Sequence, residues 1–109
     1  MAKYLLIESR DPFEANDVAS YFYGLATRLA ELGNTVTLFL VQNGVLPARR
    51  CAFSERLSAA HQAGVEVLAD EFSLKERGIG SSQMIAEVKP APLDVVVDQL
   101  AEGRKALWH

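Results

Sequence analysis

Apolar and polar positions alternate in blocks along the chain, and each block has the length of a strand or a helix. Short apolar runs predict extended segments at Lys3–Glu8, Thr35–Gln42, Val65–Ala69, Ile85–Val88 (a strand or an extended edge) and Lys105–Trp108. Helical spacing of apolar residues fills the intervals, from Asp11 to Leu32, Pro47 to Ala63, Leu74 to Arg77 and Leu93 to Leu100, and it is interrupted within Pro47 to Ala63. Strands that alternate with helices through short connections imply βαβ units. We therefore expect an α/β fold, a three-layer α/β/α sandwich around a mostly parallel sheet of about five strands.

The first helix has two possible starts and one apolar stripe. The segment Asp11-Pro-Phe-Glu14 fits a start, because Asp11 can cap, proline suits the first helical position and Glu14 completes a capping box. Asn16 is a second possible cap, so the start stays open between the two. The stripe expected to face the core consists of Val18, Phe22, Leu25, Leu29 and Leu32.

Tyr21 and Tyr23 stand on either side of Phe22, and the three rings cannot all point the same way. Because Phe22 belongs to the apolar stripe, we expect both tyrosines on the flanks of the helix. Trp108 is another ring that is costly to leave in water. Aromatic residues are enriched at the centres of protein interfaces, so these side chains predict a surface for association. The alternative is that each packs at the rim of a small core.

Composition places the chain among globular proteins and excludes several partners. Of its 109 residues, 50% are hydrophobic and 23% are charged, which suffices for a single domain over residues 1–109 without a disulfide or metal. The 11 Lys and Arg residues are outnumbered by 14 Asp and Glu residues, and the net charge is −3. Nucleic acids and anionic membranes attract clustered positive charge, so we expect neither as a partner.

Residues that carry chemistry are few. Cys51 is the single cysteine, which excludes an intrachain disulfide and a multi-thiolate metal site. His61 and His109 match no metal-ligand spacing, and the loop after the first strand lacks the glycines of a phosphate-binding motif. We therefore expect no metal and no cofactor. The longest apolar run is too short to cross a bilayer and the N-terminus does not resemble a signal peptide, so a cytoplasmic protein is expected.

Sites in parallel α/β sheets form outside the carboxyl ends of the strands. The loops expected there are Ser9–Ala15, Gln42–Cys51 and Asp70–Ser73. Ser9 and Arg10 are candidates to hold a small anion beside a helix N-terminus, although such a pair is more often solvated or structural. With Asn43 and Gly44 of the second loop, they predict a binding site for a small anionic ligand.

Cys51 follows Arg49 and Arg50 near a predicted helix start. Cationic neighbours and the helix dipole favour the thiolate form of a cysteine, which is the nucleophile. Cys51 is therefore a candidate catalytic residue, with the two arginines as binding residues. The alternative is a small buried residue, because cysteine is among the residue types most often found in cores.

Asp70 and Glu71 follow the third predicted strand. Paired carboxylates can serve acid–base catalysis, but adjacent residues of a strand point to opposite faces. Asp70 is therefore expected to cap the short helix that follows it. His61 lies among alanines of a helix and is expected on the surface or at an interface.

Four stretches of the chain have the order and spacing of one known family. They are Gly24-Leu-Ala-Thr-Arg-Leu-Ala-Glu-Leu-Gly33 with Val36-Thr-Leu-Phe-Leu-Val-Gln-Asn-Gly-Val45, then Gly64-Val-Glu-Val-Leu-Ala-Asp-Glu-Phe-Ser-Leu-Lys-Glu-Arg-Gly-Ile79, and Leu93-Asp-Val-Val-Val-Asp-Gln-Leu-Ala-Glu-Gly103. Over nearly its whole length the chain resembles the DsrE/DsrF/DsrH (TusBCD) family of small sulfur-relay proteins.

This resemblance implies a flavodoxin-like α/β/α sandwich and assembly into homo- or hetero-oligomers with related subunits, with a sulfur-carrier protein as a candidate partner. Active members of the family carry sulfur as a persulfide on a cysteine just after the third strand. The matching position here is Asp70, and a carboxylate cannot form a persulfide. An aspartate at this place and a tryptophan near the C-terminus are closer to the DsrH/TusB type, while the long first helix looks more like DsrE.

Three functions compete on these residues. The first is an oligomeric protein of intracellular sulfur transfer that binds partners and has no catalytic role, because Asp70 replaces the family cysteine. The second is a sulfurtransferase that carries a persulfide on Cys51. The third is a small anionic-ligand binding module at Arg10.

Overall fold

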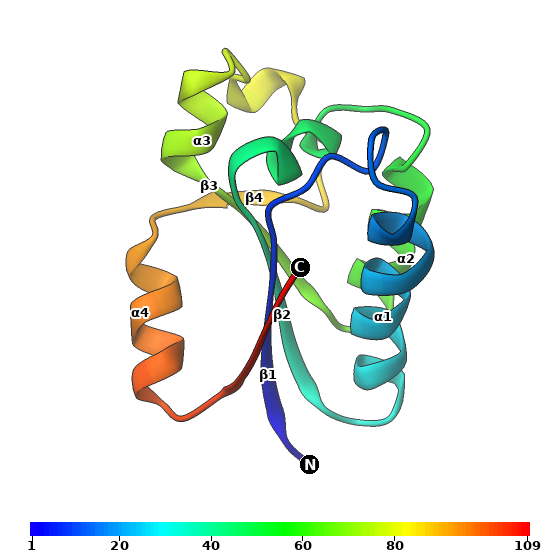
Figure 1. Cartoon of the computed structure of the whole chain (residues 1–109), viewed down its shortest axis with the longest axis vertical. Coiled ribbons are helices and arrows are strands. Elements are labelled where there is room, and N and C mark those ends of the chain that lie inside the picture. Colours follow the sequence, from blue (N-terminus) through cyan, green and yellow to red (C-terminus); the bar gives the residue numbers. More distant parts are fainter.

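The sheet has five strands in the order β4-β3-β2-β1-β5, and every neighbouring pair is parallel. A computed structural model describes all 109 residues. The strands are β1 (Lys3–Glu8), β2 (Thr35–Leu40), β3 (Glu66–Asp70), β4 (Lys89–Ala91) and β5 (Lys105–Trp108). The last strand of the chain, β5, pairs with the first, β1 (Figure 1). Segments about a hundred residues apart in the sequence therefore end side by side.

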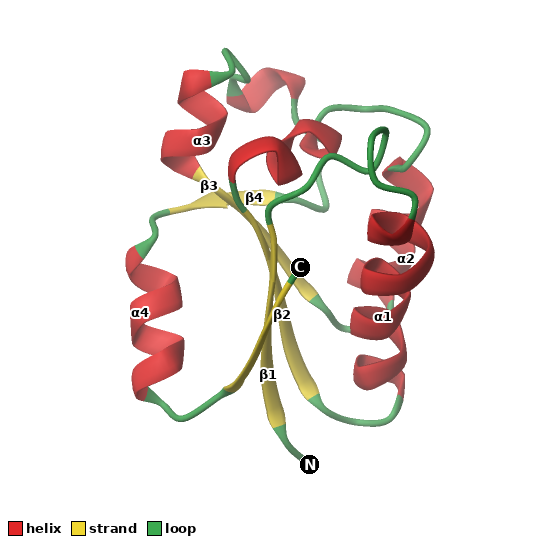
Figure 2. Cartoon of the chain, in the orientation of Figure 1, coloured by secondary structure: helices red, strands yellow, loops and turns green.

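Helices cover both faces of this sheet (Figure 2). They are a π-helical segment Val18–Tyr23 that continues into α1 (Gly24–Glu31), α2 (Ser54–Gln62), α3 (Glu71–Glu76) and α4 (Asp94–Ala101), with 3-10 segments at Gln42–Ala48 and Ser81–Gln83. α1 and α2 lie on one side of the sheet and α4 lies on the other. The predicted α/β fold with a parallel sheet is confirmed. No helix combines the length and the apolar character that crossing a membrane requires.

Each face of the sheet packs against its own cluster of buried side chains. On the α1–α2 face, 21 buried residues form one cluster, which includes Leu6 and Leu38. On the α4 face the hydrophobic cluster has only six buried residues, among them Leu5 and Phe39, with Val96 of α4 partly covered beside them. Successive residues of a strand point to opposite faces, which is why Leu5 and Leu6 enter different clusters.

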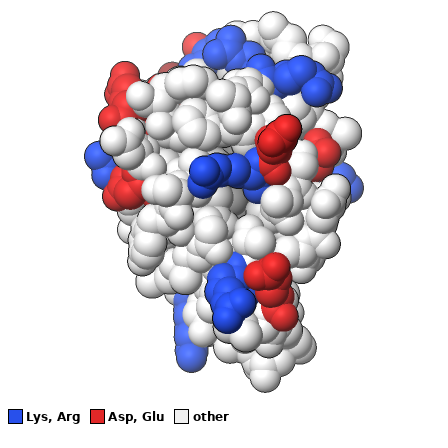
Figure 3. Space-filling model, turned by 90° about the vertical axis from the view of Figure 1, so that its right-hand side faces the viewer, with Lys and Arg blue, Asp and Glu red and all other residues white.

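Charged side chains are dispersed over the side of the molecule where α1 and α2 lie. Figure 3 shows Lys and Arg beside Asp and Glu in small groups, which uncharged surface separates. This side therefore carries no broad area of one sign.

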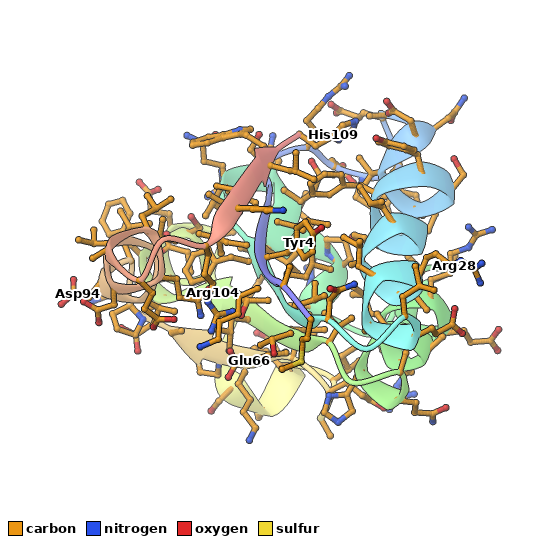
Figure 4. The ribbon with its side chains drawn as sticks, turned by 90° about the horizontal axis from the view of Figure 1, so that it is seen from below. Tyr4, Arg28, Glu66, Asp94, Arg104 and His109 are labelled. Carbon is orange, nitrogen blue, oxygen red and sulfur yellow. The ribbon has the colours of Figure 1, made fainter.

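A hydrogen-bonded group of polar side chains ties α4 to the sheet. The Thr37 hydroxyl of β2 donates to the Glu66 carboxylate of β3 at 3.2 Å. It accepts from the Gln99 side-chain amide of α4 at 3.1 Å and from the Arg104 guanidinium at 3.2 Å. Glu66 and Arg104 are seen beside each other when the molecule is viewed from below (Figure 4). The α4 face thus depends on polar contacts as well as on apolar burial.

The fourth strand lies further along the chain than the sequence pattern predicts. Ile85–Val88 is a turn, closed by a hydrogen bond from the Val88 N–H to the Ile85 carbonyl, and β4 is Lys89–Ala91. Sequence reasoning treats Pro90 as a break because proline has no N–H to donate to a sheet. β4 is an edge strand with one neighbour, so the side on which Pro90 lacks an N–H donor can point away from the rest of the sheet.

Helical structure after β1 follows the second predicted start, at Asn16, within one residue and not the first. The Asp11 carbonyl accepts the N–H groups of Glu14 and Ala15, and its carboxylate accepts the Phe13 N–H at 3.0 Å. These bonds close a local turn, and the helical path begins at Val18. Asp11 therefore organises a loop at the end of β1.

Tyr23 is buried, with 1% of its surface exposed, although the sequence predicts it on the helix flank. The reason is the π-helical path from Val18 to Tyr23. In such a turn the hydrogen bonds span five residues, so Tyr23 shares the inward face of Val18. Tyr21 is exposed, as predicted, while Leu32 of the predicted stripe is exposed just beyond α1.

The helix predicted over Pro47–Ala63 is two separate elements. The first part belongs to the 3-10 segment Gln42–Ala48, and α2 begins only at Ser54. Between them Arg49 is extended and forms an isolated antiparallel bridge with Met84. A long-range backbone contact therefore overrides the local helical preference.

Candidate functional site

The predicted site loops meet at one end of the sheet, which is formed by the carboxyl ends of β1, β2, β3 and β5. β1 pairs with both β2 and β5, so Glu8, Leu40 and Trp108 end neighbouring strands. The loop after β1 and the 3-10 segment after β2 lie above them in Figure 1, with α3 close by. This end of the sheet is the candidate functional site.

Asp70 is the cap of α3, as the sequence predicts. Its Oδ2 accepts the Ser73 N–H at 3.1 Å and the Ser73 hydroxyl at 2.7 Å, and both residues are buried. The Ser73 Oγ in turn accepts the Gln42 N–H at 2.8 Å. Gln42 has a φ of 51°, a left-handed conformation that costs energy for a residue other than glycine. Asp70 therefore acts through Ser73 to hold the turn after β2.

Asn43 and Gly44, the other predicted binding residues of this loop, have structural contacts. The Asn43 Oδ1 accepts from Arg77 Nε at 3.1 Å and Nη2 at 3.0 Å. A Cβ on Gly44 would overlap the backbone carbonyl oxygen of Glu8. Only glycine lets the two backbones approach this closely, so the loop after β2 is packed directly on the end of β1.

Cys51, Arg49 and Arg50 line one cavity of about 470 Å³, so the structure brings these predicted residues together. The remaining lining residues are Asp11, Phe13 and Leu46. Cys51 is partly exposed, and its Sγ accepts the Phe53 N–H at 3.4 Å. A backbone N–H directed at sulfur stabilises negative charge there. The cavity therefore has a partly exposed thiol and two arginines among its lining residues.

Ser9, Arg10 and Asn43 line a second cavity, of about 270 Å³, together with Asp11, Glu14 and Ala15. Carboxylates surround the Arg10 guanidinium here, because Asp11 and Glu14 line the cavity and Asp17 lies 3.9 Å from Nη1. Opposite charges this close compensate the cation. The geometry therefore gives the predicted anion site at Arg10 little support.

Glu8, His109 and Asp17 form a cluster that the sequence reasoning missed. The His109 Nδ1 lies 2.8 Å from Glu8 Oε1, and its Nε2 lies 2.9 Å from Asp17 Oδ2. The ring stacks on Phe22, with centroids 5.0 Å apart. Figure 4 shows His109 at the end of β5 beside the first helical segment. Both ring nitrogens face carboxylate oxygens, and only the protonated imidazole donates from both.

The pKa values in this cluster follow from burial and pairing. Burial raises the pKa of Glu8, against hydrogen bonds from the Arg10 N–H and His109. Burial alone lowers the pKa of His109, but hydrogen bonds and negative charge from Asp17 and Glu8 outweigh it and the net shift is upward. The cluster is therefore a proton-binding clamp between the ends of β1 and β5.

Ser9 and Trp108 extend this clamp toward the surface. The Ser9 Oγ donates to the His109 carbonyl at 3.2 Å and accepts the Trp108 Nε1–H at 3.3 Å. The Trp108 ring itself is 70% exposed. Ser9, predicted as an anion-binding residue, thus has its side chain engaged within the chain.

Tyr23 is the other site residue that sequence reasoning missed. Its hydroxyl is buried and has no hydrogen-bond partner. Burial raises the pKa of Tyr23, and the charges of Glu8, Cys51 and Asp11 raise it further. The hydroxyl is therefore an unpaired polar group within the core of the α1–α2 face. No spacing in the sequence signals this, because it depends on the π-helical turn.

The sequence matches the DsrE/DsrF-like family over residues 2–108, so the chain belongs to this family. No curated protein matches it.

Solved structures with the same fold come from bacteria and an archaeon. The ychN protein from E. coli has 19% sequence identity and a TM-score of 0.90, with 100% of both chains covered. MTH1491 from Methanobacterium thermoautotrophicum, a protein of unknown function, has 17% identity and a TM-score of 0.83 over 100% of both chains. BT1422 from Bacteroides thetaiotaomicron, also of unknown function, has 15% identity and a TM-score of 0.78, with 96% of this chain and 94% of that chain covered. Identities this low show the fold alone.

Proposed function

We propose that this chain is a partner-binding, non-catalytic member of its family, which acts in intracellular sulfur transfer in the cytoplasm. One observation carries the proposal: Asp70 stands where active relatives are expected to carry a persulfide cysteine. Its carboxylate cannot hold sulfur, and it is buried in hydrogen bonds to Ser73. The residue that does chemistry in such relatives is here a structural cap.

The surface that supports partner binding lies on the α4 side and is called the α4–β5 patch. Its members are Leu93, which precedes α4, Val97 and Leu100 of α4, and Trp108 of β5. Val97 is 63% exposed and Trp108 70%. The thin cluster beneath α4 leaves these apolar side chains in water, and clustered exposed apolar residues mark association surfaces. The occupant we propose is a second copy of the chain or a related subunit.

The test is the size of the protein in solution. Wild type at micromolar concentration is expected to elute as an oligomer in size-exclusion chromatography with light scattering, and Val97→Asp is expected to shift it toward the monomer. Leu32→Asp is the matched control, because Leu32 is equally exposed (64%) at the end of α1, outside the patch. A monomeric wild type, or equal effects of both substitutions, would overturn the assignment of this patch.

Sulfur acceptance by Cys51 is a second candidate function. The supporting observation is the cavity in which a partly exposed Sγ, held by the Phe53 N–H, lies with Arg49 and Arg50. After incubation with glutathione persulfide, the intact mass of wild type is expected to rise by one sulfur atom, and Cys51→Ala is expected to stay unchanged. A Cys51 thiol that is inert in the native protein would remove this candidate.

A further inference from the structure

The two edges of the sheet differ in how well they are protected against pairing with a further strand. β4, at one edge, has only three residues, and two of them are Lys89 and Pro90. Short length, lysine and proline are devices that keep an edge strand from pairing with another chain. β5, at the other edge, has no proline and ends in Leu107 and Trp108, which are both exposed. No helix or strand lies along its outer side (Figure 4), so β5 is open to a further strand.

The backbone of β5 offers hydrogen-bonding groups on this open side. The His109 N–H donates to the Ile7 carbonyl and the Ser9 N–H donates to the His109 carbonyl, so both backbone groups of His109 are directed at β1. Successive residues of a strand direct these groups to opposite sides. Ala106 and Trp108 therefore direct their N–H and carbonyl groups away from β1, toward solvent.

The side chains of β5 make both faces of this edge apolar. Leu107 pairs with Leu6 of the α1–α2 cluster, and Trp108 pairs with Ile7 of the α4 cluster. Paired residues of neighbouring strands point to the same face of a sheet. Leu107 therefore lies on the α1–α2 side, while Trp108 lies on the α4 side with the small side chain of Ala106.

We propose that β5 pairs with β5 of a second copy of the chain, antiparallel and centred on Leu107, so that the two sheets join into one. The inference rests on the proposed function, partner binding. It names the partner as a second copy and the contact as a strand edge.

The backbone and the side chains both favour this register. When a two-fold axis passes through the sheet at Leu107, Ala106 lies opposite the partner's Trp108 and exchanges N–H and carbonyl hydrogen bonds with it. Every outward group of Ala106 and Trp108 then has a partner, and the large indole lies beside the smallest side chain of the strand. An axis at Ala106 would instead place Lys105 against the apolar side chain of the partner's Leu107.

Charges at the ends of the two strands also complement each other. Lys105 comes opposite the partner's His109, on the side of the sheet where the clamp lies. The clamp holds two carboxylates, those of Glu8 and Asp17, around a single imidazole. The Lys105 ammonium forms no ion pair within the chain and lies 5.8 Å from the centre of the Tyr4 ring. Opposite charges placed across two strands stabilise their pairing.

Ala106→Pro tests the backbone hydrogen bonds. Because the Ala106 N–H points away from β1, proline at this position removes no hydrogen bond inside the chain, and the melting temperature is expected to stay close to that of wild type. The mass of the oligomer, measured by light scattering at micromolar concentration, is expected to fall at least twofold. Ala106→Ser is the matched control, because serine is small and keeps the N–H, and it should leave the mass unchanged.

Leu107→Cys, in a Cys51→Ser background, tests the register. A residue on the axis faces its own copy in a non-hydrogen-bonded pair, with Cα atoms about 4.5 Å apart. A disulfide can form at this distance. Mild oxidation is therefore expected to give a covalent dimer on a non-reducing gel. Lys105→Cys in the same background is the control: it is also exposed on β5, but lies away from the axis and should stay a free thiol.

The outcomes distinguish this inference from the function on which it rests. If Val97→Asp dissociates the oligomer while Ala106→Pro keeps it and Leu107→Cys stays unlinked, the strand pairing is wrong and partner binding through α4 stands. If Lys105→Cys is linked as readily as Leu107→Cys, the register is wrong and the inference fails with it. A monomeric wild type would overturn both.

Discussion

The two faces of the sheet differ in how completely this chain covers them. On the α1–α2 face, 21 buried residues make a core of the kind that stabilises an isolated domain. On the α4 face the buried cluster has six residues, and α4 turns Leu93, Val97 and Leu100 toward water. Both faces are built from the same strands, whose side chains alternate between them. The difference therefore lies in the helices, and it is the reason why the proposed partner surface is placed on the α4 face.

The two faces also differ in their polar groups. The α1–α2 face ends in the clamp, where Glu8 is fully buried and paired with His109. The α4 face is crossed by the Thr37, Gln99 and Arg104 hydrogen bonds. The clamp joins the ends of two strands beside the candidate site, whereas the Thr37 group attaches a helix. The clamp therefore fixes the end of the sheet that carries the candidate site, and the Thr37 hydrogen bonds fix α4 on the sheet.

The largest effect should come from deleting a side chain on the thick face. Leu38→Ala is expected to lower the free energy of unfolding by about 3 kcal/mol, because Leu38 is fully buried and its neighbours cannot close the cavity. Val96→Ala on the α4 face should cost about 1 kcal/mol, because Val96 is only partly buried. Urea denaturation of the two variants measures both values. Equal losses would mean that the two faces contribute alike.

The next effect concerns the buried charges. His109→Ala is expected to cost about 2–3 kcal/mol, because it leaves the Glu8 carboxylate buried without its partner. Thr37→Val on the other face should cost less, about 1–2 kcal/mol, because Glu66 is exposed to solvent and Arg104 keeps Glu102 as a partner. Restoration of stability in the double variant Glu8→Gln, His109→Ala would support the pairing. A larger loss for Thr37→Val would reverse the comparison.

A smaller effect is expected at Asp70, which belongs to neither face. Asp70→Ala removes the cap of α3 and should lower the free energy of unfolding by about 1 kcal/mol. Asp70→Asn keeps an oxygen that accepts the Ser73 N–H and should lose less than half of that. If Asp70→Asn is as damaging as Asp70→Ala, the negative charge matters more than the cap.

The smallest effect is the pH dependence of stability. The clamp at the end of the α1–α2 face should make the melting temperature change with pH. The pKa of His109 is raised in the fold, so its contribution is complete below the pKa of the free imidazole and is lost as pH rises through the raised value. The raised pKa of Glu8 acts in the same direction at lower pH. Melting temperatures measured from pH ~6 to ~9 should fall for wild type and fall less for His109→Gln. His61→Gln, at an exposed histidine, should keep the wild-type slope.

Local signals in the sequence predicted the elements well and their boundaries less well. Apolar runs at Lys3–Glu8 and Lys105–Trp108 match β1 and β5 to the residue. The fourth strand was placed too early, because Pro90 looks like a break unless its strand is known to lie at an edge. Tyr23 was placed on the wrong side of its helix, because the ordinary helical period does not hold in a π-helical turn.

The candidate site was predicted only where its contacts are local. Asp70 and Ser73 are three residues apart, and a capping aspartate can be read from that spacing. Arg49, Arg50 and Cys51 are consecutive and share one cavity.

The sequence by itself determined the succession of strands and helices along the chain, the parallel α/β class and the role of Asp70 as a helix cap, because each depends on residues close together in the chain. The tertiary structure alone decided which distant groups meet. It set β5 beside β1, which brings His109 to Glu8 across 101 positions. It also turned Tyr23 inward into the core of the α1–α2 face and left the buried cluster on the α4 face small. Such contacts depend on strand order and helix register, which hydrophobic periodicity does not encode.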